Sequence, residues 1–134
     1  MRSLRVILMV IAVSQLVLGV LFLAAPTLVR NIFQFETAEP GWTDWLMVMM
    51  GGRFLGFAYG MYLAARDPSR HVAWINAMIV VQAVDWIATV IHLATGDVRL
   101  TQVPTTVVMP VVAVVVLMWL HPGRTTADTF ARDR

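Results

Sequence analysis

Residues 49–60 read MMGGRFLGFAYG and place one arginine, Arg53, in the middle of a long apolar run. Apolar runs of roughly 20 residues have the length that a helix needs to cross a bilayer. A charge at the centre of such a helix costs at least about 2.5–3.5 kcal/mol on insertion scales. The surroundings of Arg53 therefore bear both on the fold and on where a site would lie.

The composition of the 134-residue chain is typical of a membrane protein. Hydrophobic residues make up 59% and charged residues 13%, and the mean hydropathy is +0.75. A soluble domain has nearly half of its residues apolar and about a quarter charged. All ten basic residues are arginine and cysteine is absent, which excludes lysine Schiff bases, disulfides and thiolate chemistry. A net charge of +2 gives no sign of a nucleic-acid partner.

Four apolar segments predict an all-α fold, an integral membrane four-helix transmembrane bundle in one domain. The predicted helices cover residues 4–25, 43–65, 68–95 and 104–120. Asp67 and Pro68 are typical of an N-cap and a first helical residue, and Gly96 of a helix-ending glycine. Pro110 predicts a bend. The segment TLVRNIFQF after the first helix is either a surface amphipathic piece or an ordinary loop.

The first segment also has features of a cleaved signal peptide, since Arg2 and Arg5 form a basic start. Its run of about 20 apolar residues exceeds the usual h-region of about 7–15, so we expect a retained helix.

The arginines predict the orientation. With the N-terminus inside, seven lie at inner ends: Arg2, Arg5, Arg66, Arg70, Arg124, Arg132 and Arg134. Only Arg30 and Arg99 fall in outer loops, so both termini, including the polar tail 122–134, are expected in the cytoplasm. Tryptophans lie near both expected interfaces, at Trp42, Trp45, Trp74 and Trp119.

Arg53 and Asp85 have the same expected depth. At about 1.5 Å per residue, each lies about 15 Å from the outer end of its helix. The polar side chains inside the third helix fall on one stripe. That stripe contains His71, Ile75, Met78, Gln82, Asp85, Thr89 and His92. We expect Arg53 to face the bundle interior and pair with Asp85, with hydrogen bonds from Gln82 and Gln15.

Small residues accompany Arg53 along its helix. They recur at four-residue spacing, at Gly52, Gly56, Gly60 and Ala64. Such a row lets helix backbones approach closely, so we expect these positions to pack against a neighbouring helix.

The polar layer has three interpretations: a structural clamp, a ligand site that could include His92, or a proton or ion path. His71 and His121 lie at one interface but lack a third good metal ligand. Haem held by His92 and a methionine would lack partners at equal depth. No serine–histidine–acid set or HExxH motif is present, so no catalytic residue, metal or cofactor is predicted.

The middle third of the chain resembles a known family. The residues that carry the likeness are Gly52, Arg53, Gly60, the Ala64-Ala65-Arg66-Asp67-Pro68 turn, Trp74, Gln82 and Asp85-Trp86. They are similar to the BphX-like proteins within the DoxX-like group of small four-helix bacterial membrane proteins. This resemblance implies a protein of the bacterial inner membrane. It further implies either that its gene lies among genes for aromatic-compound breakdown or that it is a small subunit of a membrane oxidoreductase. It supplies no catalytic residues.

Three functions follow as expectations. The first is a non-catalytic accessory or assembly subunit of a membrane complex, whose partner is another membrane protein or a second copy. The second is a carrier of a lipophilic small molecule, in a pocket beside Arg53, Asp85 and the aromatic residues Phe54, Phe57 and Tyr59. The third is a membrane enzyme that uses Asp85 as acid or base.

Overall fold

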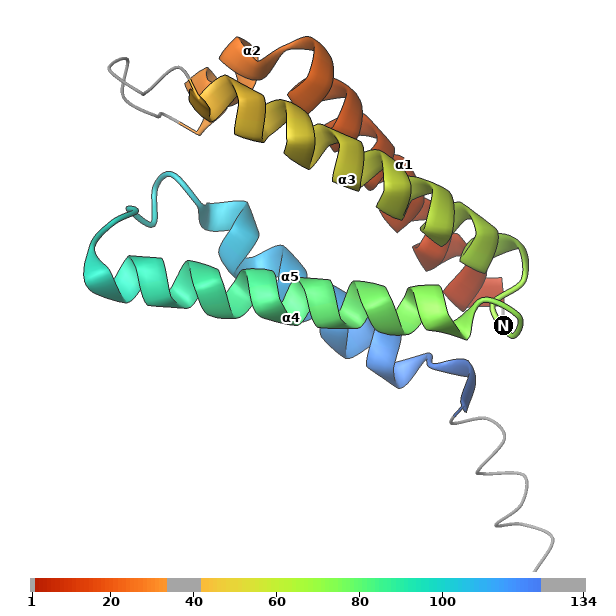
Figure 1. Cartoon of the computed structure of the whole chain (residues 1–134). Helices are drawn as coiled ribbons and strands as arrows, with labels where there is room; N and C mark the ends of the chain where they lie inside the picture. The colour runs from red at the N-terminus through yellow and green to blue at the C-terminus, as the bar shows by residue number, and fades with distance from the viewer. Residues whose placement is uncertain (1, 34–41, 124–134) are drawn as a thin grey trace, which may run out of the picture.

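A computed structural model describes residues 2–33 and 42–123, which fold entirely into helices and connecting turns. The helices are α1 (Arg2–Ala24), α2 (Pro26–Ile32), α3 (Trp42–Arg66), α4 (Val72–Thr95) and α5 (Pro104–Trp119). They form two antiparallel pairs, α1 with α3 and α4 with α5, joined by the turn between α3 and α4 (Figure 1). The all-helical expectation is confirmed.

Three of these helices, α1, α3 and α4, are long and apolar enough to cross a membrane. Helix α5 is apolar as well but has only 16 residues, about 24 Å at the usual helical rise. A typical hydrocarbon core is about 30 Å thick. The structure thus supports three of the four predicted spans by length and composition.

Helices α1 and α3 pack closely along their length. The buried face of α1 is Leu4, Leu8, Ala12, Gln15 and Gly19. The backbones approach at Gly19 and Gly51, because a Cβ built on Gly51 would lie 3.0 Å from the carbonyl oxygen of Gly19. A Cβ on Gly19 would in turn lie 3.1 Å from the carbonyl oxygen of Gly51. Only glycine allows this approach without a shift of one helix.

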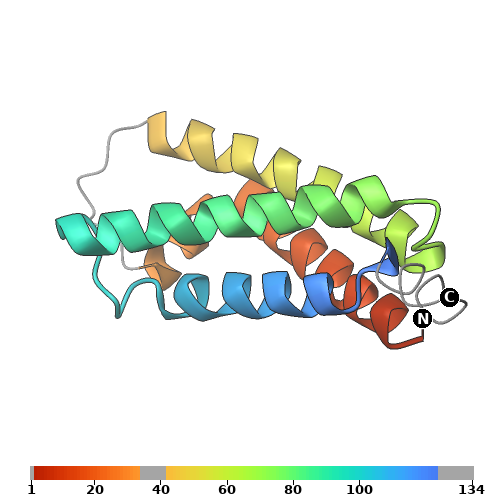
Figure 2. The same cartoon turned by 90° about the horizontal axis from the view of Figure 1, so that it is seen from below.

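The two pairs meet at the end that holds the N-terminus and the α3–α4 turn, which we call the closed end (Figures 1 and 2). Its core draws on α1, α3, α4 and α5: Leu4, Leu8, Ala12, Met61, Ala64, Ala65, Ile75, Met78 and Leu117. Trp74 of α4 packs on this core, and a Cβ on Gly60 of α3 would overlap its indole ring. Trp74 therefore also serves helix packing at the closed end.

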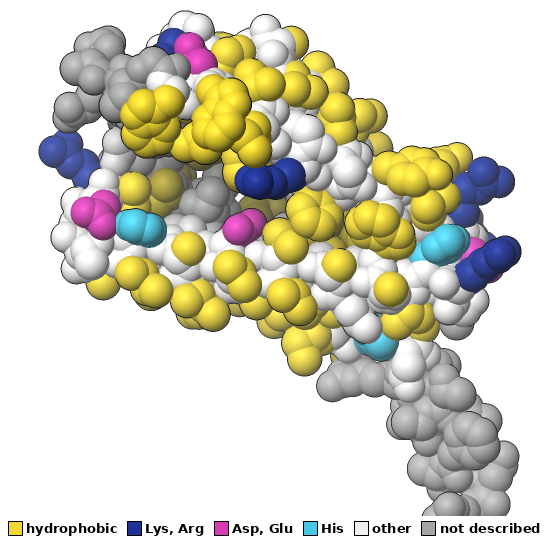
Figure 3. Space-filling model, in the orientation of Figure 1, with side chains coloured by type: hydrophobic (Ala, Val, Ile, Leu, Met, Phe, Trp, Pro, Cys, Tyr) yellow, Lys and Arg dark blue, Asp and Glu magenta, His cyan; other side chains and the backbone are white. Residues whose placement is uncertain are grey.

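Toward the α4–α5 loop the two pairs separate, and we call the space between them the wedge (Figure 1). The space-filling view shows a hollow between α3 and α4 with acidic and basic side chains along it (Figure 3). Helix α4 has buried side chains at Ile75 and Met78 and none in its second half. The wedge is thus open along half of α4.

The α3–α4 turn differs from its prediction, since α4 begins at Val72 and not at Pro68. The Asp67 carboxylate accepts hydrogen bonds from the Ser69 hydroxyl (2.6 Å) and the Arg70 N–H (3.2 Å). These bonds close a single local turn, with Pro68 fully buried, before the chain enters α4. Gly96 ends α4 at φ 82°, as predicted.

Part of the segment TLVRNIFQF is helical, as α2. Val29 is buried, and Arg30 forms an ion pair with Asp44 in the first turn of α3 (3.3 Å). Helix α2 is therefore tied to α3. Pro110 lies inside α5 and is buried. The predicted tail beyond residue 123, with Arg124, Arg132 and Arg134, lies outside the described residues.

Candidate functional site at the mouth of the wedge

Two stripes of side chains lead from the closed end into the wedge. On α3 the stripe runs from Ala64 and Gly60 through Phe57 to Arg53. Ala64 is fully buried and Phe57 packs against the core, so this stripe faces α4. Residues three or four apart share one helix face, which places Arg53 on the α3 wall of the wedge.

The opposite wall is the matching stripe of α4. Ile75 and Met78 are fully buried in the core, Gln82 is half-buried, and Asp85 is exposed. The steps of three and four residues put Asp85 on the α4 wall. Arg53 and Asp85 also lie equally far from the closed end, about 20 Å by helical rise. The predicted common stripe and depth of the two charges agree with this arrangement.

The predicted ion pair between Arg53 and Asp85 is absent. Within residues 2–33 and 42–123, ion pairs join Arg30 to Asp44 and His92 to Asp97, and none joins Arg53 to Asp85. Arg53 instead points a guanidinium nitrogen at Met50 Sδ of its own helix, at a long 3.8 Å. The physical reason is that α3 and α4 diverge along the wedge and are already apart at the level of Arg53 and Asp85.

The two glutamines do not bind these charges either. Gln82 points its amide nitrogen at Met78 Sδ, 3.6 Å away on its own helix. Gln15 is 7% exposed in the α1–α3 contact, and its Oε1 has no hydrogen-bond partner within residues 2–33 and 42–123. Gln15 therefore belongs to the interior of the α1–α3 pair and not to the wedge.

The predicted glycine row divides into two groups. Among the described residues, nothing lies within 4 Å of a Cβ built on Gly52 or Gly56, so these two glycines make no close helix contact within the chain and their role in packing stays a prediction. Gly60 and Ala64 do pack at the closed end. The close α1–α3 contact uses Gly51, which was not among the predicted packing residues. Leu55, four residues further on, lies on the same side, because a Cβ built on Gly19 would meet its side chain. No pattern in the sequence alone distinguishes Gly51 from Gly52.

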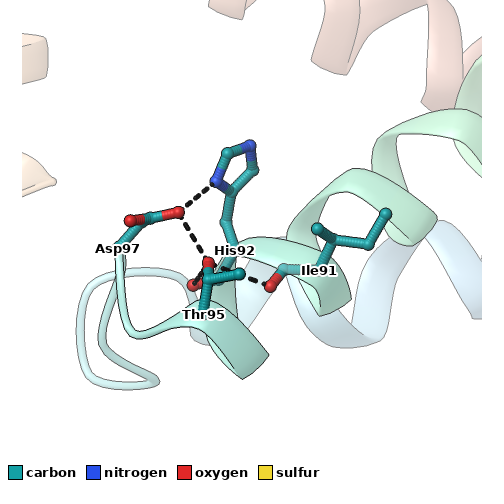
Figure 4. Close-up of polar contacts among 4 residues, drawn as sticks. All are labelled: Ile91, His92, Thr95 and Asp97. Atoms are coloured by element: carbon teal, nitrogen blue, oxygen red, sulfur yellow. Dashed lines mark hydrogen bonds and ion pairs between the residues drawn. The ribbon is translucent and has the colours of Figure 1, made fainter.

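His92 lies apart from Arg53 and Asp85, at the end of α4. Its Nδ1 lies 2.9 Å from Asp97 Oδ2, and the Thr95 hydroxyl lies 2.6 Å from the same oxygen (Figure 4). The His92 carbonyl accepts the N–H groups of Asp97 and Val98, and the Gly96 N–H bonds Leu93. These are the bonds of a glycine-terminated helix end. His92 thus takes part in a helix-ending cluster.

The hydrogen bonds of this cluster favour the ionised form of Asp97. The Thr95 hydroxyl, and after it His92, lower the pKa of the Asp97 carboxyl below its ordinary value. At the other end of α4, the Ser69 hydroxyl and the Arg70 N–H lower the pKa of Asp67 in the same way. The lowered pKa values favour the ionised form of both carboxyls, which lie on either side of the apolar part of α4.

A polar link between α4 and the end of α5 was not predicted from the sequence. His121, just after α5, lies with Nε2 2.8 Å from Asn76 Oδ1 in α4. The two residues are far apart in sequence and each is common at helix ends, so no local pattern pairs them. This bond lies at the closed end and ties α5 to α4.

The three candidate aromatic residues do not gather. Phe57 lies on the wedge stripe, but Phe54 packs edge-on against Phe22 of α1, with ring centroids 5.2 Å apart. Tyr59 is 63% exposed. Only Phe57 of the three therefore lies on the wall that carries Arg53.

No protein-family model, curated protein or solved structure matches this sequence. The resemblance to the BphX-like and DoxX-like proteins stays a prediction.

Proposed function

We propose that this chain is a small integral membrane subunit that docks a partner protein inside the bilayer and carries out no chemistry itself. It would lie in a bacterial inner membrane with both termini in the cytoplasm, as the arginine distribution favours. This orientation requires α5 to cross as a fourth span, with the bilayer adapting to its shorter length.

The observation that carries the proposal is the state of Arg53 and Asp85. Both are exposed on the wedge walls, at mid-helix depth, and neither is bound to an opposite charge in the described part of the chain. An intramembrane charge costs several kcal/mol unless another group pairs with it. A partner that enters the wedge would supply those groups and cover the apolar walls at the same time.

The test is extraction of the full-length, tagged chain from its native membrane in mild detergent, followed by mass spectrometry of intact complexes. We expect a stoichiometric protein partner with the wild type, and its loss when Arg53→Gln and Asp85→Asn remove both charges. Arg66→Gln is the matched control, because Arg66 lies at the inner end of α3 and bonds Tyr62. A wild-type chain that runs alone would contradict the proposal.

A carrier of a lipophilic small molecule is the second candidate. The hollow between α3 and α4 favours it, because Phe57 and Arg53 share the α3 wall and could hold a lipophile with an anionic or π-rich headgroup (Figure 3). The same extraction distinguishes it: a bound small molecule without a protein partner, lost in Arg53→Ala and kept in Arg66→Ala, would favour the carrier.

A further inference from the structure

We infer that the partner in the wedge is a second copy of this chain, held by two reciprocal Arg53–Asp85 pairs between the copies. This inference rests on the proposed function and names the partner that it leaves open.

The first support is that the two walls are complementary in charge. The α3 wall carries a cation at Arg53 and the α4 wall an anion at Asp85, and the wedge keeps them from pairing within the chain. In a twofold dimer, a residue i that contacts j of the partner is matched by j contacting i of the partner. A surface that carries one cation and one anion can therefore form two equivalent ion pairs with its twofold-related copy, because each Arg53 can pair with Asp85 of the other copy.

The second support is their equal depth. Two copies with the same orientation in a membrane are related by an axis along the bilayer normal, and such an axis keeps every residue at its own depth. Only residues at one level can then pair reciprocally. Arg53 and Asp85 meet this condition, because each lies the same number of residues from the closed end of its helix.

The third support is the shape. In a dimer whose two wedges face each other, α3 of each copy lies beside α4 of the other copy. Each Arg53 then adjoins Asp85 of the other copy. The pairs α1–α3 and α4–α5, which make the extensive contacts within the chain, need not open for this. The half-buried and exposed second half of α4 gains a neighbour.

Charge exchange between two differently tagged full-length copies tests this inference. Arg53→Asp alone makes both wedge charges negative and Asp85→Arg alone makes both positive, so each variant should lose at least tenfold in self-association. A mixture of the two variants restores both pairs between copies. We expect the mixture to co-purify as the wild type does, and Arg66→Asp, as the control, to leave association unchanged.

The double variant Arg53→Asp with Asp85→Arg distinguishes pairing between copies from pairing within one chain. If this double variant recovers its stability while the mixture of single variants stays apart, the two charges pair within one chain and the inference is overturned.

Cysteine cross-linking gives a second readout that does not depend on charge repulsion. The chain has no cysteine, so Arg53→Cys in one copy and Asp85→Cys in the other introduce the only two thiols. Oxidation should give a covalent dimer, and Val10→Cys with Asp85→Cys should not, because Val10 is exposed on α1. Membrane-inserted copies that give no dimer would overturn the inference, whereas a different stoichiometric protein in the mass spectrum would leave the proposed function standing.

Discussion

The closed end and the open end of the wedge are built from the same two helix stripes, yet they are held in different ways. At the closed end the α3 stripe presents Gly60 and Ala64, and the α4 stripe presents Ile75 and Met78, so small and large apolar groups interlock. About two turns further on, the stripes present Arg53 and Asp85, and the walls are apart. Apolar packing therefore holds the two helix pairs together at the closed end, whereas at the open end the two charged side chains are exposed and do not pair with each other.

The largest change in this comparison is expected from Gly60→Ala. The new Cβ would overlap the indole of Trp74, a rigid group that is itself packed on the core. We expect a loss of about 3 kcal/mol in unfolding free energy, the upper end for an overpacked site. Unfolding in detergent measures it. Gly56→Ala, where the Cβ meets nothing within 4 Å, should gain about 0.5–1 kcal/mol. Equal effects would show that the closed end does not depend on this contact.

Leu117→Ala tests whether α5 belongs to the closed end. Leu117 is fully buried in the core, and its truncation leaves a cavity. We expect a loss of about 2 kcal/mol, the low end for such substitutions, because lipid is as apolar as leucine and only packing is lost. The neighbouring Met118 is 50% exposed, so Met118→Ala should change the same unfolding free energy little. A similar loss for both variants would mean that α5 packs differently.

A smaller effect is expected from Gly51→Ala within the α1–α3 pair. Its Cβ would lie 3.0 Å from the Gly19 carbonyl oxygen and 3.1 Å from the Leu23 nitrogen, and backbone atoms cannot move aside. We expect a loss of about 1–2 kcal/mol on unfolding. Gly52→Ala, one residue along, should be neutral or stabilising. If the ranking reverses, α3 is rotated relative to α1 from the arrangement described.

The smallest effect concerns the end of α4 beside the wedge. Because folding lowers the pKa of Asp97, the carboxylate adds stability above its ordinary pKa, and this contribution is lost as the pH falls through the lowered value. Thr95→Val removes the principal hydrogen bond and should raise the pKa of Asp97 toward the ordinary value. NMR titration of that carboxyl measures the change. Thr89→Val, whose hydroxyl bonds the Asp85 carbonyl, is the control and should leave the titration in place.

Helical periodicity predicted the parts of the site that depend on one helix at a time. The positions of Arg53 and Asp85 on their stripes, and their common depth, follow from spacing along each helix. The predictions that were wrong or missing concern contacts between two helices. Gly51 and Gly52 are adjacent and identical, and only the rotation of α3 against α1 decides which of them packs. The predicted ion pair between Arg53 and Asp85 was wrong for the same reason, because the sequence of a single helix does not show that the two helix pairs diverge.

The unequal lengths of the two helices in the second hairpin bear on the lipid around the molecule. Helix α4 is about 36 Å long and its neighbour α5 about 24 Å, against a hydrocarbon core of about 30 Å. If both cross, hydrocarbon chains beside α5 must shorten by on the order of 6 Å, while α4 tilts to fit. Such a hydrophobic mismatch favours thin bilayers, and two copies that turn their α5 sides away from each other would thin the bilayer along both outer flanks.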